Sequence, residues 1–343
     1  MTSRIFPLCS LISIATALLL FTSEIYAQDA NLSSVSVTRL MDQPIIRPDL
    51  HPSIGQNIQG PSLIRVPDWV ENPLGKYYLY FADHKGRYIR LAYADELAGP
   101  WRIHVSGSLT IEQSYFASTP PPITDEQLAE LTAARRGVSG LGSPVSHDLA
   151  LEFTMPHIAS PDVHIDDETQ SIIMYYHGLE GPAFQHTRVA TSEDGINFTA
   201  REENLGRSYF RTFKYNEMTY ALAMPGQFYR SKDGFTNFEE GPLLFNPNMR
   251  HTAVIVRDDY LYVFWTRVGD APESILLSTI DLRSDWTTWS ESKEVIFNEY
   301  VVPSNVNLNG SVPYVINLYI KILLSRKLKL KSSLALILIL ILL

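Results

Sequence analysis

A unit of short β-strand patterns recurs four times along this 343-residue chain. Each copy has a β-branched run, an aromatic-rich run, a third run after a polar loop, and a turn that ends in an aromatic residue. The copies cover residues 60–104, 160–202, 208–241 and 251–292. Four-strand units that repeat at about 40 to 50 residues are typical of a β-propeller. We therefore predict an all-β fold in which each copy forms one blade.

The C-terminal region breaks the repeat. Residues 298–314 begin like the approach to another blade, but no acidic residue follows Glu299, and the last ten residues are aliphatic. We therefore predict a five-bladed propeller over residues 55–303 with its last blade truncated, and an atypical basic and aliphatic tail over residues 304–343. A membrane-binding role for this tail is left open as an alternative.

The N-terminus has the pattern of a secretory signal. Arg4 precedes an apolar run over residues 8–21, and Ala27 ends a plausible cleavage site. Residues 1–27 are therefore predicted to direct the protein outside the cell or into the periplasm, with an uncleaved anchor as the alternative. Residues 28–54 would form an N-terminal extension. Cys9 is the only cysteine, so the mature chain would hold neither a disulfide nor a thiolate metal site.

The body of the chain is acidic. Residues 28–299 contain 36 acidic and 22 basic residues, a net charge of −14. Because phosphate binding needs a basic surface, this balance argues against a nucleic-acid partner. No membrane contact is expected apart from the signal segment and the tail.

An insertion over residues 105–158 separates the first two copies. It contains three consecutive prolines, Pro120 to Pro122, and Thr124 and Gln127 match a helix capping box. The insertion is predicted to hold a short helix and to serve either as a lid over a site or as packing. In the later copies, the Asp194-Gly195 and Asp233-Gly234 pairs predict tight structural hairpins rather than binding loops.

Polar residues are predicted to converge at the mouth of the central channel. In a blade, the start of the first strand lies beside the end of the second, because the two strands run antiparallel. Applied to every copy, this rule collects carboxylates, histidines, arginines and amides: Asn57, Gln59, Asp83, His84, His157, Asp162, His177, Glu180, Arg211, Gln227, Arg250, His251, Arg267, Asp270 and Glu273.

Each of these residues also has a structural interpretation. Asp162 follows a proline and would suit the start of a strand, and His177 would suit a buried, hydrogen-bonded position. Arg250 and Arg267 would suit ion pairs with Asp270. The functional hypothesis therefore depends on convergence at one place.

The chemistry that uses two carboxylates across a channel is glycoside hydrolysis, in which one acid protonates the leaving oxygen and the other activates water or attacks the sugar. We predict Asp162, Glu180, Glu273 and Asp83 as the catalytic candidates. The remaining polar residues at the mouth are predicted to bind the substrate: Gln59, His84, His157, His177, Arg211, Gln227, Arg250, His251, Arg267 and Asp270.

The stretches GPSLIRVPDW, GKYYLYFADHKG and HIASPDVHIDDETQSIIMYYHG, with the SxDGxxF turns, resemble the five-bladed glycosidase propellers of glycoside hydrolase family 43 and its arabinosidase, xylosidase and fructan hydrolase relatives. The resemblance covers about residues 55–300. It implies an aspartate base, a second aspartate that tunes pKa and a glutamate acid. By position, Asp162 resembles one of the aspartates, and Glu180 or Glu273 the acid. Gly60-Pro61 stands where many family members have Asp-Pro, so a base expected there is missing unless Asp83 replaces it.

We therefore predict a secreted glycoside hydrolase-like protein that acts on a plant or algal polysaccharide or oligosaccharide. A non-catalytic carbohydrate-binding propeller is the alternative. No cofactor and no protein-bound metal are predicted to be required, and the resemblance suggests Ca²⁺ in the channel as a further option.

Overall fold

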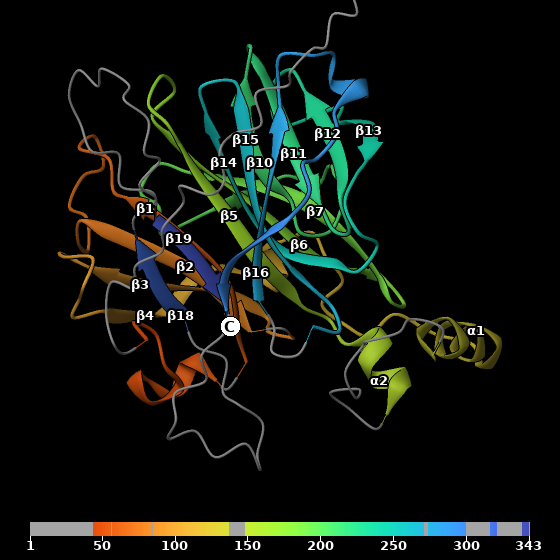
Figure 1. Ribbon diagram of the computed structural model, residues 1–343. Coiled ribbons are helices and arrows are strands. Elements are labelled where there is room, and N and C mark those ends of the chain that lie inside the picture. Colours follow the sequence, from red (N-terminus) through yellow and green to blue (C-terminus); the bar gives the residue numbers. More distant parts are fainter. Residues whose placement is uncertain are drawn as a thin grey trace, which may run out of the picture.

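The computed structural model describes residues 44–55, 57–83, 85–136, 148–270, 274–299, 316–320 and 338–342. Within these ranges four antiparallel sheets hold four or five strands each, built from strands consecutive in sequence, and β18 (Ile316–Ile320) and β19 (Leu338–Leu342) form a fifth, two-stranded sheet. The four larger sheets are arranged as the blades of a β-propeller (Figure 1). The predicted all-β propeller arrangement is therefore confirmed, with four blades in the part of the chain that the structure describes.

The four blades correspond to the four copies of the sequence repeat. Their strands are, in order, β1 (Ile58–Arg65), β2 (Tyr77–Asp83), β3 (Tyr88–Ala94) and β4 (Arg102–Thr110); β5 (Ile158–Asp166), β6 (Ser171–Gly181), β7 (Phe184–Ser192) and β8 (Thr199–Ala200), with β9 (Gly206–Arg207) also paired to β7; β10 (Arg211–Tyr215), β11 (Met218–Ala223), β12 (Gln227–Ser231) and β13 (Glu239–Leu243); and β14 (Met249–Arg257), β15 (Tyr260–Arg267), β16 (Ser274–Asp281) and β17 (Val295–Glu299).

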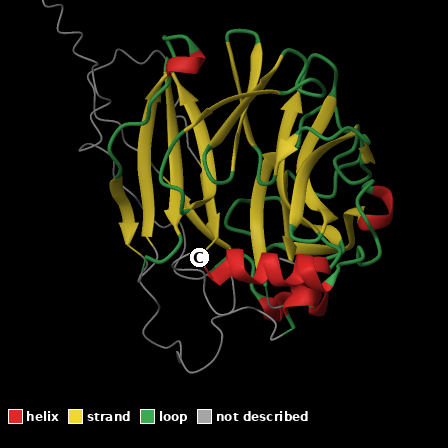
Figure 2. Ribbon diagram, turned by 90° about the vertical axis from the view of Figure 1, so that its right-hand side faces the viewer, coloured by secondary structure: helices red, strands yellow, loops and turns green. Residues whose placement is uncertain are grey.

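The insertion between the first two blades contains helices α1 (Asp125–Arg136) and α2 (Leu149–Thr154). The predicted capping box is confirmed, because the Gln127 N–H donates to Thr124 Oγ1 at 3.2 Å and the Thr124 N–H donates to Gln127 Oε1 at 3.1 Å. The helices lie together beyond one end of the strands (Figure 2). No helix in the described ranges has the length and apolar character needed to cross a membrane.

The short 3₁₀ helices η2 (Pro48–Leu50) and η3 (Pro52–Ile54) precede the first blade, and η4 (Ile111–Gln113) and η5 (Trp286–Thr288) lie in later connections. Ile45, Ile46 and Ile54 pack with β2 residues Leu79 and Phe81. The described part of the N-terminal extension therefore covers one face of the first blade.

The predicted aspartate–glycine turns have the structural role expected from the sequence. Asp194 Oδ1 accepts the N–H groups of Ile196 and Asn197, and Asp233 Oδ1 accepts those of Phe235 and Thr236. Gly195 and Gly234 have φ values of 72° and 74°, which a glycine adopts without strain.

One backbone feature recurs on the inner strand of every blade. Gly60, Ser160, Tyr209 and His251 all have a positive φ, between 47° and 67°. In three of the four blades the pairing of the inner strand slips at this point, as a β-bulge does. The second residue after each positive-φ residue is Ser62, Asp162, Arg211 or Ala253. We call this place in the repeat the latch position.

At the first two latch positions, the side chain accepts a backbone N–H from the next blade. Ser62 Oγ accepts the Val163 N–H at 2.9 Å, and Asp162 Oδ2 accepts the Thr212 N–H at 2.8 Å. Val163 and Thr212 each directly follow a latch position, so the same contact is repeated from blade to blade.

A tyrosine hydroxyl strengthens each of the same two blade interfaces. Tyr80 and Tyr175 are the cross-strand partners of Ser62 and Asp162. Their hydroxyls donate to the turn carbonyls of the following blade, at Gly195 (2.7 Å) and Gly234 (2.8 Å). Burial is the main cause that raises the pKa of both phenols, so both hydroxyls stay protonated donors.

Gly60 allows the first two blades to approach closely. A Cβ atom at this position would lie 2.4 Å from the Ser160 Cα, and φ is +58°. We expect Gly60→Ala, and likewise the aspartate that many family 43 proteins carry here, to lower the free energy of unfolding by about 2–4 kcal/mol in urea titrations.

Gly181→Ala is the matched control, because a Cβ atom there would lie 3.9 Å from Phe184 Cβ, an ordinary van der Waals distance. A Gly60→Ala variant as stable as this control would contradict the close approach of the two inner strands.

Candidate functional site

Asp162 is a buried carboxylate on the inner strand of the second blade, 9% exposed. In addition to the Thr212 N–H, its Oδ2 contacts Thr212 Oγ1 at 3.1 Å and His164 Nε2 at 2.8 Å. The Arg211 guanidinium lies 3.6 Å from its Oδ1. The carboxylate is therefore fixed between the inner strands of blades two and three.

These neighbours keep Asp162 ionised. Burial alone raises the pKa of the carboxyl, but its interactions with His164, the Arg211 guanidinium and the Thr212 N–H together outweigh it. The pKa of Asp162 therefore lies below its ordinary value, which suits a base or an electrostatic stabiliser rather than a proton donor.

Arg211 joins three blades with one side chain. Its Nη1 donates to the Pro161 carbonyl at 2.8 Å, and its Nε donates to the Thr252 carbonyl at 2.9 Å. Pro161 and Thr252 each follow a positive-φ residue, so the guanidinium binds both neighbouring bulges. Arg211 was predicted to bind substrate, but the structure directs its guanidinium to these carbonyls and to Asp162.

Three of the predicted histidines lie in one row of rings with a tyrosine. The ring centroids of His157 and His177 are 6.1 Å apart, those of His177 and Tyr209 are 4.2 Å apart, and those of Tyr209 and His251 are 6.1 Å apart. We call this set the ring row. It crosses from blade two to blade four. His157 and His177 are 1% exposed, whereas His251 is partly exposed.

Tyr209 was missed from the sequence, although it connects the predicted histidines. Burial raises the pKa of its phenol, while Ser160, Arg211 and Arg250 act in the opposite direction. Its hydroxyl is therefore a protonated group near two guanidinium groups. Tyr209 is the positive-φ residue of blade three, so an alignment of the copies on Gly60, Ser160 and His251 would have identified it.

Glu180 is not brought to Asp162. Its carboxylate pairs with Arg188 at 3.1 Å on the adjacent strand, and the Arg188 guanidinium lies over the Phe116 ring. Tyr175, the cross-strand partner of Asp162, precedes Glu180 by five residues, or about 17 Å along a strand. Catalytic carboxylates of glycosidases lie about 5 to 9.5 Å apart.

Asp83 is likewise held by a neighbouring arginine. Its Oδ2 lies 3.4 Å from Arg90 Nη2, and the Arg90 Nε donates to the Ser53 carbonyl at 3.0 Å. This pairing connects the end of β2 to the N-terminal extension. It is a contact within the wall of blade one.

The other predicted residues are placed as follows. Gln59 is buried on β1, and the Gln227 amide donates to the Gly241 carbonyl on β13 at 2.7 Å. Arg267 pairs with Glu294 at 2.7 Å, a partner that the sequence did not indicate, and Asp270 follows the turn after β15. His84 and Glu273 lie outside the described residues.

No group of three or more metal-ligating side chains is found among the residues that the structure describes. The ring row contributes three imidazoles, but carboxylates do not join it in a ligand set within those ranges. The requirement for a cofactor or for Ca²⁺ stays a prediction.

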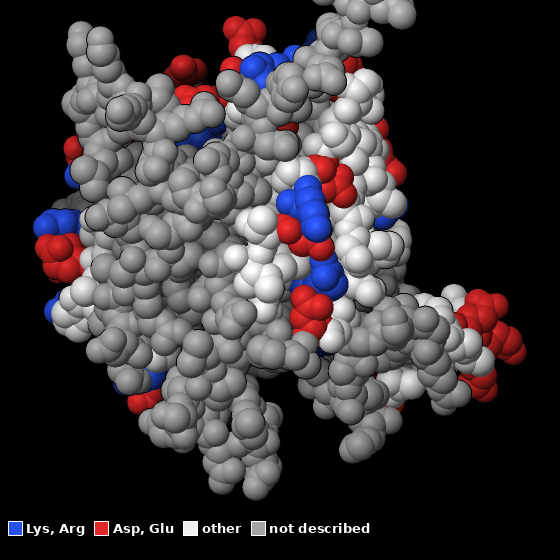
Figure 3. All heavy atoms as spheres, in the orientation of Figure 1, with Lys and Arg blue, Asp and Glu red and all other residues white. Residues whose placement is uncertain are grey.

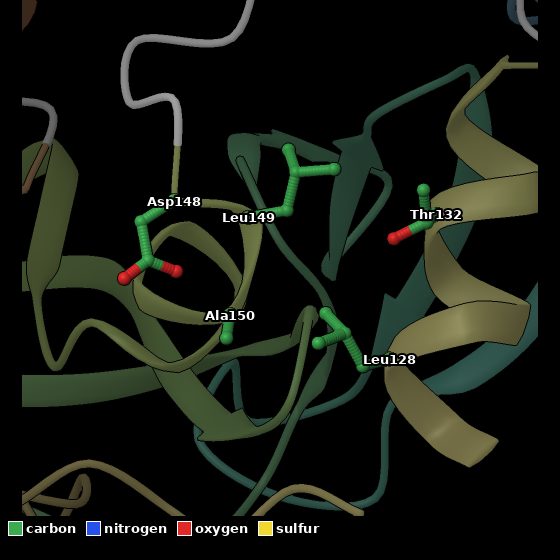
Figure 4. Close-up of a pocket in the computed structure, with 5 residues that line it drawn as sticks. All are labelled: Leu128, Thr132, Asp148, Leu149 and Ala150. Atoms are coloured by element: carbon green, nitrogen blue, oxygen red, sulfur yellow. The ribbon is translucent and has the colours of Figure 1, made fainter. Parts of the chain in front are cut away.

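A hollow of about 600 Å³ lies between α1 and α2, away from Asp162. Leu128 and Thr132 line it from α1, and Leu149 and Ala150 from α2, while Asp148 caps α2 through the Leu151 N–H at 3.0 Å (Figure 4). Among the described lining residues, Thr132 and Asp148 carry the polar side chains, so this part of the hollow offers less chemistry than the ring row.

The insertion packs against the second blade. Phe116 meets the Tyr176 ring edge-on at 5.8 Å, and the Tyr176 hydroxyl donates to the Ser114 carbonyl at 2.8 Å. At the end of α2, the Phe153 carbonyl accepts the Ala183 N–H at 2.8 Å. Packing is therefore an established role of the insertion, and a lid function stays a prediction.

Charged side chains of both signs alternate over the described part of the face in Figure 3, and acidic side chains gather over α1. Asp125, Glu126 and Glu130 supply acidic groups on that helix. Asp125 and Glu126 lie in its first turn, where negative charge favours the helix dipole.

No protein-family model matches this chain. A curated relative, uncharacterized protein R118 of Acanthamoeba polyphaga mimivirus, is 32% identical over 260 residues, which cover 68% of this chain and 65% of the relative. The match thus spans somewhat less than two thirds of the length of that relative.

Solved structures of glycoside hydrolases are similar in fold. A candidate glycoside hydrolase from Parabacteroides distasonis is 10% identical, with a TM-score of 0.50 over 83% of this chain and 93% of that chain. A family 43 β-xylosidase/α-arabinofuranosidase from a compost microbial metagenome, solved with xylotriose, is 13% identical, with a TM-score of 0.48 over 83% of this chain and 89% of that chain.

We expect Arg211→Met to lower the free energy of unfolding by about 2–4 kcal/mol, because two bulge carbonyls and Asp162 lose a charged partner together. Urea denaturation at pH 7 measures this. Arg65→Met is the control, since Arg65 is largely exposed and lies 3.8 Å from the exposed Asp68. Equal effects of the two substitutions would argue against a special role of Arg211 at the axis.

We also expect Asp162→Asn to destabilise the fold in a pH-dependent way. The folded-state pKa of Asp162 is depressed, so its ionised form stabilises the fold above the ordinary aspartate pKa of about 3.9, and this contribution is lost as the pH falls through the folded-state value. The variant should lose about 1–3 kcal/mol at pH 7, and its difference from the parent should shrink below about pH 4.

Asp95→Asn serves as the control for an exposed carboxylate. A destabilisation by Asp162→Asn that stays constant from pH 7 to pH 3 would show that the charge of Asp162 does not carry the contact.

Proposed function

We propose that this protein is a secreted glycosidase-like propeller that binds a saccharide at the mouth of its central channel and cleaves a glycosidic bond. The observation that carries the proposal is the ionised Asp162 carboxylate, fixed on the inner strand that begins directly after His157 of the ring row. The similarity in fold to a candidate glycoside hydrolase supports the class of activity.

In this proposal Asp162 and Glu273 have different roles. The depressed pKa of Asp162 suits the base or stabilising carboxylate. A general acid must instead stay protonated until it donates to the leaving oxygen. Glu180 pairs with Arg188 and Asp83 with Arg90, so we assign the acid to Glu273 from its place in the sequence.

The partly exposed His251 and Arg250 would contact the saccharide, and the Tyr209 ring packs against His251. Plant or algal polysaccharides and their oligosaccharides are the proposed substrates. We also propose that residues 1–27 direct export of the protein. The propeller ring is proposed to have five blade positions.

A non-catalytic carbohydrate-binding propeller is the second candidate. Two observations favour it: Asp162 Oδ2 already holds the Thr212 N–H, and Gly60 occupies the place of an aspartate in the resembled family. A carboxylate oxygen that accepts a structural hydrogen bond is less available to act as a base or a nucleophile.

Glu273→Gln tests the assignment. We expect it to lower kcat about 100-fold or more on oligosaccharides, because the leaving oxygen loses its proton donor, while saccharide binding measured by calorimetry is retained. The loss should be smaller on dinitrophenyl glycosides, whose leaving group needs no protonation.

Glu180→Gln is the matched control and should leave kcat unchanged, since Arg188 already engages this carboxylate. Binding without hydrolysis by the parent protein would support the second candidate. Neither binding nor hydrolysis across a panel of xylans, arabinans, fructans and galactans would contradict both.

A further inference from the structure

At the latch position of the fourth blade, apolar side chains stand where the first two blades have polar ones. Its latch position is Ala253, whose cross-strand partner is Phe264. The matching pairs are Ser62 with Tyr80 and Asp162 with Tyr175, and all four of these residues bond to the next blade. Ala253 and Phe264 have no side-chain group that can form such a hydrogen bond.

The face of the fourth blade that carries Phe264 is buried. Phe264 and Leu277 are 0% exposed and Ile275 is 1% exposed. They alternate with Val263, Trp265 and Leu276, which pack toward the third blade. Because successive side chains of a strand point to opposite faces, Phe264, Leu277 and Ile275 face away from blade three. An apolar element must therefore cover them.

The C-terminal hairpin is positioned to cover this face of the fourth blade. Strand β18 (Ile316–Ile320) pairs antiparallel with β19 (Leu338–Leu342). Strand β19 contacts both β1 of the first blade and β14 of the fourth blade, and β18 also contacts β1. The hairpin lies beside β1 in Figure 1. The residues of β19 are all leucine or isoleucine, which matches an apolar seam.

We infer that the hairpin β18–β19 closes the ring by filling the seam between the fourth and first blades. The tail, predicted to be atypical from its composition, is then a structural part of the domain. The chain's own hairpin is the occupant, because it already touches inner strands on both sides of the seam. An open seam would leave apolar faces and strand edges available for association. This inference does not depend on the proposed function.

The test uses the full chain with paired aspartates in β19. Leu338→Asp with Leu340→Asp, and Ile339→Asp with Ile341→Asp, address the two faces of the strand in turn. Leu243→Asp, at a leucine that is 60% exposed on the outer strand of blade three, is the control. Hydrogen–deuterium exchange is followed in β1, β14, and β10 to β12.

We expect at least one pair to raise exchange in β1 and β14 by about tenfold or more, while β10 to β12 stay protected and the control changes nothing. Unchanged exchange in β1 and β14 for both pairs would overturn the inference. Faster exchange in every blade would show global unfolding, and the following measurement then decides.

A photo-crosslinking residue in place of Leu340 leaves the hairpin aliphatic in character and locates its neighbours. Crosslinks to β1 or β14 within one chain are expected. Crosslinks between chains, together with a dimer mass by light scattering, would place a second copy in the seam. Crosslinks only to added lipid vesicles would favour a membrane tail, and either result would overturn the inference.

Discussion

The contact between the Asp162 carboxylate and the Thr212 N–H is the constraint on which this arrangement depends. It reproduces, with a charged acceptor, the Ser62 to Val163 contact of the preceding interface. A propeller blade has no backbone ladder to its neighbour, so contacts of this kind must fix the relative position of adjacent blades. The bulges make them possible, since they turn the latch position toward the next inner strand.

The charge of Asp162 at its latch position affects both the packing of the blades and the chemistry of the candidate site. A serine there would hold the Thr212 N–H, but an aspartate also attracts Arg211, which in turn binds carbonyls of blades two and four. One ionised carboxylate therefore organises three blades through its contacts with Thr212 and Arg211. The contacts that lower the pKa of Asp162 also hold its carboxylate in place. The carboxylate is therefore preorganised but less mobile.

Local sequence patterns predicted the elements of the fold well. The blade repeat, the α1 capping box and the aspartate–glycine turns depend on interactions within a few residues, and all are found where the sequence placed them. Partner choice was far less predictable. Arg267 was predicted to bind substrate, with an Asp270 ion pair as the structural alternative, but it pairs with Glu294. The partners of Glu180 and Asp83 come from the next strand of their own blades. Such choices depend on strand register, which composition does not specify.

The sequence by itself determined that this chain forms repeated antiparallel blades, because period-two alternation and turn residues act over short distances. It also brought His157, His177 and His251 toward one end of the strands through simple antiparallel geometry. Only the tertiary structure decided which groups meet there. It inserted Tyr209 between the histidines, directed Arg211 to backbone carbonyls, and placed the aliphatic β19 against β1 and β14. These outcomes depend on bulges and blade-to-blade packing, in which residues from different blades approach within a few ångströms.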